Sequence, residues 1–186
     1  FFESHLGGEE EDYDVLHHPS GTIVDGNTTA WNQARGIVAG GISSPAEYAA
    51  IQEYIDLEDY IDHLIVRIWS GDYDWCGPLY LNGVDETHFR RKNWYAGRRS
   101  RGNPGKFRFF TWDAEMSMGL HLGRPGNQGI TNFDLTGVSD SGSAMEFYGA
   151  LREYPDFKLL FADHLHRHFF NDGLMTVASN QDRIDA

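Results

Sequence analysis

The sequence contains a single cysteine, Cys76, so the chain cannot form an internal disulfide. This scarcity is compatible with a reducing compartment and does not exclude export. The sequence also lacks any apolar run close to the roughly 18–20 residues that a membrane-spanning helix needs. We therefore expect no membrane span. The chain begins FFESHLGGEE, without an initiator methionine, and we expect it to be part of a longer protein.

Positive charge is scarce as well. Lys and Arg total 15 against 28 Asp and Glu, which gives a formal net charge of -13. Proteins that bind nucleic acids need a basic face to meet the phosphates, so this balance argues against a nucleic-acid partner. An acidic chain favours solubility, and it is compatible with a site that collects metal cations.

Apolar and aromatic residues are sufficient for a buried core. They make up 40% and 14% of 186 residues, a length that suits one domain or most of one. Capping signals and apolar periodicity predict helices in five places. These are Ala30–Val38, the segment that starts at Ser44-Pro45, Leu57–Trp69, SAMEFYGALREY and PDFKLLFADHLHRHFF. We expect an α+β fold that is mainly helical and has one central β-hairpin.

The hairpin is predicted over Trp94–Ser100 and Lys106–Trp112, joined by the turn RGNPG. Side chains alternate along a strand, so the aromatic residues of the second strand fall on both of its faces. We therefore expect this strand to be largely buried, with core positions at Trp94, Phe109, Phe110 and Trp112.

Two oxygen-bearing side chains flank the open end of this hairpin: Asn93 precedes the first strand and Asp113 follows the second. Paired strands lie about 5 Å apart, so the two residues are expected at one rim. Amide and carboxylate oxygens suit Mg²⁺, which keeps positions for phosphate oxygens. Asp74, in the preceding loop, is placed to accept a proton from an attacking hydroxyl. Aspartate, asparagine, hairpin and aspartate follow one another in this order in protein kinases.

The stretches SGDYDW, NWYAGRR and GKFRFFTWDAEMSMG, in this order, resemble the CotH kinase family, atypical kinases first known from spore coats. GGEEEDYDVL, VDGNTTAWN, YIDLEDYIDHLI and DFKLLFADHLHRHFFNDG resemble its bacterial, often exported, members. The resemblance implies a protein-kinase-like C-lobe that transfers phosphate from Mg²⁺-ATP to Ser or Thr of secreted or surface proteins. It also implies an extracellular or cell-surface parent protein, Asp74 as the catalytic-loop aspartate, and Asn93 and Asp113 as the residues that hold Mg²⁺ and, through it, ATP.

The sequence departs from the family pattern in two places. In kinases about five residues separate the catalytic aspartate from the metal-binding asparagine, whereas Asp74 and Asn93 are 19 positions apart. The extra CGPLYLNGVDETHFRRK either bulges outward or displaces Asp74, in which case Asp72 and Asp85 are the alternative candidates. The second departure is the lobe that grips the nucleotide, which we expect upstream of this chain. Residues 1–186 would then be a partial kinase domain.

Two other interpretations stay open. A kinase-derived surface or adhesion module that has lost turnover would carry the same motifs, and the long insertion favours it. His164 and His168 stand four apart, which places two imidazoles on one helix face, but a metal-dependent hydrolase would need them to face Asp113. No acidic residue follows the metalloprotease pattern, and the family resemblance implies a packing helix. Glu115 and the basic stretch RRKNWYAGRRSR are weaker candidates, for the metal and for phosphate.

Overall fold

The computed structural model describes residues 2–18, 21–72, 75, 80–81, 84–85, 92–114, 117–118, 136–137 and 144–185. Within these residues the fold is α+β, as the sequence predicts, and about half helical, with a four-stranded antiparallel sheet and a separate two-stranded one. None of the helices in this part of the chain combines the length and the apolar character needed to cross a membrane.

The sheet has the order β2-β1-β5-β6, and each neighbouring pair is antiparallel. Its strands are β1 (Tyr13–His17), β2 (Thr22–Asp25), β5 (Trp94–Arg99) and β6 (Arg108–Thr111). The predicted hairpin corresponds to β5 and β6, in which Trp94 pairs with Thr111. The sheet is wider than the predicted hairpin because β1 pairs along the free edge of β5. A separate two-stranded pair consists of β3 (Tyr80–Leu81) and β4 (Val84–Asp85).

Helix α3 begins where the sequence places its cap. At the start of α3, Ser44 Oγ accepts a hydrogen bond from the Glu47 N–H at 3.3 Å, and the Glu47 carboxylate accepts the Ser44 N–H at 2.9 Å. The helices are α1 (Phe2–Leu6), α2 (Thr29–Val38), α3 (Pro45–Gln52), α4 (Leu57–Trp69), α5 (Met145–Leu151), α6 (Pro155–Phe169) and α7 (Val177–Asp185), with a 3₁₀ turn at Glu10–Asp12.

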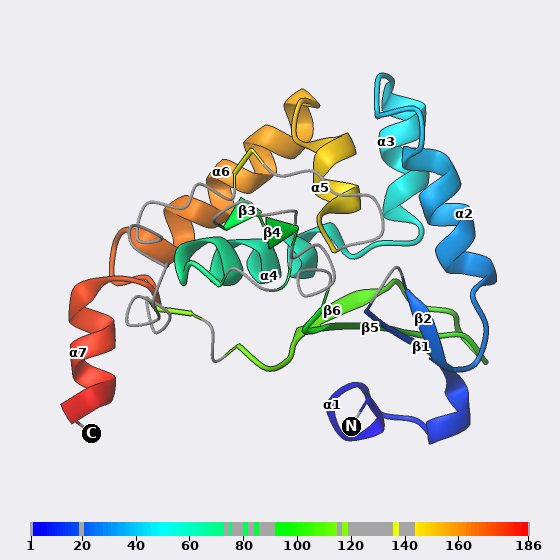
Figure 1. Cartoon of the computed structure of the whole chain (residues 1–186), viewed down its shortest axis with the longest axis horizontal. Helices are drawn as coiled ribbons and strands as arrows, with labels where there is room; N and C mark the ends of the chain where they lie inside the picture. Colours follow the sequence, from blue (N-terminus) through cyan, green and yellow to red (C-terminus); the bar gives the residue numbers. More distant parts are fainter. Residues whose placement is uncertain are drawn as a thin grey trace.

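Helix α4 lies between the sheet and α6, as Figure 1 shows, and it contacts β6 and α6. Its predicted apolar stripe faces the core: most of its residues are buried, and Ile68 is partly buried against them. In the view of Figure 1, α1 lies on the side of the sheet away from α4. Helix α4 therefore contacts both β6, the strand that leads to Asp113, and helix α6.

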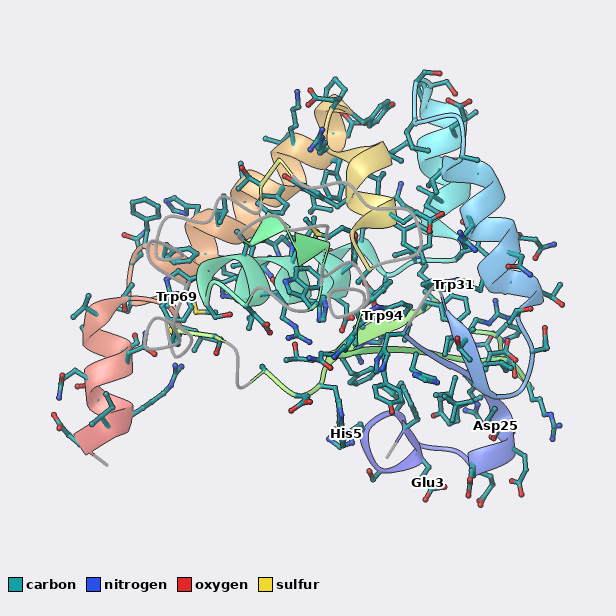
Figure 2. All side chains as sticks on the ribbon, viewed as in Figure 1. Glu3, His5, Asp25, Trp31, Trp69 and Trp94 are labelled. Carbon is teal, nitrogen blue, oxygen red and sulfur yellow. The ribbon has the colours of Figure 1, made fainter. Side chains whose placement is uncertain are left out.

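The core is centred on Trp31 of α2, which is 2% exposed. Its ring stacks on that of Trp94 at 5.7 Å between centroids, and Figure 2 shows the two side chains close together. The rings of Phe107 and Phe147 each make a T-shaped contact with the Trp31 ring, with centroids 5.2 and 5.1 Å from it. These aromatic contacts join α2, the hairpin and α5 in one cluster.

The second strand of the hairpin is buried on one face only. Phe109 is 5% exposed, in agreement with the prediction, but Trp112 is 56% exposed and is not a core residue. Phe110 is half-buried, with its ring edge-on to that of Phe2 at 5.0 Å. The helices cover the Phe109 face, whereas the opposite face meets the short α1. Gly97 allows this approach, because a Cβ at that position would collide with the Phe2 ring.

Candidate functional site

The structure brings Asn93 and Asp113 to one rim, at the open end of the β5–β6 hairpin. The Trp112 N–H donates to the Asn93 carbonyl oxygen at 3.3 Å, so the two chain ends remain paired there. Both residues have positive φ, 61° for Asn93 and 51° for Asp113. Asparagine and aspartate adopt this left-handed conformation more readily than other non-glycine residues. The residue types that suit the metal chemistry therefore also suit the backbone at both positions.

Arg67, in the last turn of α4, ties this rim to the helix. Its Nη2 donates to the carbonyl oxygens of Asn93 and, at 3.1 Å, Trp112. Its Nη1 donates to the Asp72 carboxylate, and both side chains of this ion pair are fully buried. The guanidinium also lies over the Trp75 ring, 5.5 Å from its centroid. The rim is therefore held by the core. Asp72, an alternative catalytic candidate from the sequence, is fully buried and pairs with Arg67.

The side chains at the rim are less engaged than the backbone. The Asn93 N–H donates to His18 Nδ1 at 3.1 Å. In the part of the chain that the structure describes, neither the Asn93 amide group nor the Asp113 carboxylate has a hydrogen bond or an ion pair. Asn93 is 4% exposed, whereas Asp113 is exposed. The rim thus offers two uncommitted oxygen ligands on fixed backbones, as a site for a hard cation requires.

Several predicted residues lie outside the described residues. These are Asp74, the candidate catalytic-loop aspartate, together with Glu115, Arg90 and Arg91. For Asp85 the structure gives only its place in β4, opposite Tyr80. The roles of Asp74 and Asp85 therefore stay predictions.

Two arginines of the predicted basic stretch have structural partners. Arg98 lies 3.5 Å from the buried carboxylate of Asp14, and Arg99 donates to Asp12 at 2.9 Å. Asp14 also accepts the N–H and the side-chain amide of Asn27, each at 2.9 Å. These arginines attach β5 to the segment around β1, and their charge is largely neutralised there.

Helix α4 holds β6 through a polar stripe, Asp59, His63 and Arg67, at four-residue intervals. The Asp59 carboxylate accepts Arg108 Nε–H and the Phe109 N–H, each at 2.8 Å. Burial raises the pKa of Asp59, although these two hydrogen bonds oppose the rise. The i, i+4, i+8 spacing places all three residues on one helix face. The four-residue spacing of these polar residues is visible in the sequence, but their partners on β6 and at the rim are not.

His63 is buried within this stripe, and its Nδ1 lies 3.4 Å from the Thr111 hydroxyl. Burial, together with the neighbouring Arg67 charge, lowers its pKa from 6.5 to about 3. The folded protein therefore holds a neutral His63 throughout the range in which an unfolded chain would protonate it.

We expect this neutral histidine to make the fold acid-labile. Its contribution is fully present above pH 6.5, the unfolded pKa, and is lost as the pH falls towards 3. At about pH 5 the loss should be ~2 kcal/mol relative to neutral pH. Urea unfolding of the wild type and of His63→Gln at both pH values measures it: the pH-dependent loss should shrink by that amount in the variant. An unchanged loss would show that His63 does not carry the effect.

His164 and His168 lie on one face of α6, as the spacing predicts, but their acidic partner is Asp62 of α4. Asp113 does not belong to this cluster. The hydrolase interpretation needed the histidines to face Asp113, and it is therefore wrong. The expected packing role of the helix is confirmed by its contact with α4.

Comparison of the sequence with models of known protein families identifies a family for this chain. A family model described as CotH kinase protein matches residues 8–174. Searches of curated proteins and of solved structures found no match. The matched region includes the hairpin, both residues at its rim and helix α4. The resemblance noted from the short motifs is thereby confirmed over most of the chain, which belongs to the CotH kinase family.

Proposed function

We propose that this chain supplies the metal-binding and catalytic-loop part of an atypical protein kinase, which transfers phosphate from Mg²⁺-ATP to Ser or Thr of secreted or surface proteins. In this proposal residues 1–186 correspond to the C-lobe of a protein kinase, and the lobe that grips the nucleotide lies outside them. Membership of the CotH kinase family supports kinase activity at family level. The paired ends of the hairpin are the structural observation that carries the assignment to residues.

The donor set at the rim fits Mg²⁺. Asn93 offers a neutral oxygen and Asp113 a charged one, and neither is engaged by another described residue. Mg²⁺ in phosphoryl-transfer sites takes one or two protein carboxylates and completes its coordination with water and phosphate oxygens. Two protein ligands are therefore sufficient, provided that ATP supplies the others.

Each residue then has one task. Asn93 and Asp113 position the metal, which neutralises charge on the transferred phosphate when bound. Arg67 keeps the backbones of Asn93 and Trp112 in register. Asp74 orients the acceptor hydroxyl and receives its proton, as the catalytic-loop aspartate does in kinases. Because little covalent chemistry falls to the protein, the rate depends on how rigidly these groups are held.

The proposal is tested with the full-length protein and γ-labelled ATP. We expect Mg²⁺-dependent label on Ser or Thr, either on the protein itself or on an added protein acceptor, and no label when the metal is chelated. Phosphoamino-acid analysis identifies the acceptor. A folded full-length protein that binds Mg²⁺-ATP without any transfer would instead indicate a module that has lost turnover, and the proposal would be wrong.

A further inference from the structure

Three metal-ligating side chains meet between α4 and α6, on the side of α4 that faces away from the sheet. Asp62 Oδ1 lies 2.6 Å from His164 Nδ1 and 2.8 Å from His168 Nε2. One ligand atom from each of the three residues lies within 4.8 Å of the other two. The two imidazoles are one helical turn apart on α6, and the carboxylate comes from a residue 102 positions earlier than His164.

Burial and charge at this cluster suit a cation. The His164 side chain is fully buried and that of His168 is 13% exposed, while the Asp62 side chain is 43% exposed. Partial burial raises the pKa of Asp62, but the hydrogen bonds from His164 and His168 outweigh it, and the pKa lies below its usual value. Asp62 is therefore ionised at neutral pH, and the cluster combines one negative charge with two imidazoles.

We propose that Asp62, His164 and His168 form a site for a divalent transition metal of the Zn²⁺ type, distinct from the Mg²⁺ site at the hairpin. Two imidazoles and a carboxylate are a common protein ligand set for Zn²⁺, with bonds of about 2.0–2.2 Å. Donors around a tetrahedral ion then stand roughly 3.3 Å apart. The Asp62 oxygen therefore needs to move away from the two histidine nitrogens by about 0.5–0.7 Å to admit the ion. The exposed side of Asp62 leaves the fourth position to water.

The consequence of the site is structural. Its metal would fasten α6 to α4, where the rings of Trp69 and Phe169 also meet at 6.2 Å. The sheet-facing side of α4 carries the polar stripe of Asp59, His63 and Arg67, which holds β6 and the rim. Occupancy would therefore stabilise the helix on which the candidate catalytic rim rests, without any contact between the metal and the substrate.

The experiment uses the purified chain, stripped with a chelator and dialysed. Zn²⁺ is titrated by calorimetry, and thermal unfolding is followed with and without the metal. We expect one Zn²⁺ per chain at micromolar affinity or tighter, and a rise in the unfolding midpoint of about 5 °C or more at 100-fold excess over the dissociation constant. Asp62→Asn and His168→Ala should each weaken binding at least 10-fold and remove most of the midpoint rise.

His166→Ala is the matched control, because His166 lies on the same helix but is exposed and stacks on Phe170 at 5.3 Å. It should bind Zn²⁺ as the wild type does. Since His164 is fully buried, the two more exposed ligands carry the test, and the midpoint without metal reports whether each variant folds. The proposal is overturned if the wild type binds no Zn²⁺, or if His166→Ala weakens binding as much as His168→Ala. Both readouts are independent of phosphoryl transfer, so the kinase proposal can fail while this one stands.

Discussion

Replacing Asp113 by asparagine should remove phosphoryl transfer from the full-length protein while leaving its fold intact. The substitution keeps the shape and one oxygen of the side chain but deletes the charge that would hold Mg²⁺ against the phosphates. Loss of one such electrostatic contact in a kinase-type site should lower the rate by at least about 100-fold. Asparagine also tolerates the left-handed backbone at this position, φ 51°, so strain does not confound the result.

The measurement is the initial rate of labelling at saturating Mg²⁺-ATP, with circular dichroism and the unfolding midpoint as evidence of an intact fold. Asp163→Asn is the matched control, because it deletes an exposed carboxylate on α6 away from the rim. It should keep the wild-type rate. Wild-type turnover in a folded Asp113→Asn protein would remove Asp113 from the proposed metal site.

Local signals account for the part of the fold that could be predicted. Helix α4 has the predicted bounds because its apolar residues alone define a buried stripe of the correct period. Helix α3 begins at its predicted proline because Ser44 and Glu47 cap each other across one turn. These features need only neighbouring residues, and tertiary structure does not change them.

The sheet was predicted only in part because its pairing is non-local. Strand β1 lies alongside β5, which joins residues about eighty positions apart, such as Val15 and Gly97. In the sequence, GGEEEDYDVL suggests an acidic loop that leads into a short apolar segment, since five carboxylates precede or interrupt the apolar residues. Two of them, Asp12 and Asp14, are neutralised by Arg99 and Arg98 of β5. No pattern within GGEEEDYDVL indicates that Arg98 and Arg99 are the partners of these two aspartates.

The difference between local and non-local contacts also explains which parts of the two candidate sites could be predicted. Asn93 and Asp113 were placed together from the sequence because a hairpin fixes the distance between its own ends. Their support could not be placed, because Arg67 reaches them from another element, 26 and 45 positions from its carbonyl partners. The proposed zinc site could not be predicted from the sequence for the same reason. Its histidines are visible as an i, i+4 pair, but Asp62 follows no sequence pattern that connects it to them.

Removal of the Arg67 guanidinium should strongly destabilise the protein. Arg67→Met leaves the buried Asp72 carboxylate without its ion-pair partner, and it deprives the carbonyl oxygens of Asn93 and Trp112 of a donor. Breaking a buried ion pair by removing one partner costs about 3–5 kcal/mol, because the remaining charge is buried and uncompensated. The denaturant midpoint should fall accordingly, and the hairpin rim should lose its fixed geometry.

A double variant separates the cost of an unpaired buried charge from the cost of the lost hydrogen bonds. In Arg67→Met/Asp72→Leu both charges are gone, so the double variant should be more stable than Arg67→Met alone, although two carbonyl oxygens still lack their donor. Arg99→Ala, which removes a more exposed arginine that pairs with Asp12, should cost much less. Urea unfolding of the four proteins gives the comparison. If Arg67→Met unfolds at the wild-type midpoint, Arg67 does not hold the rim, and the preorganised site inferred for Asn93 and Asp113 has no support from α4.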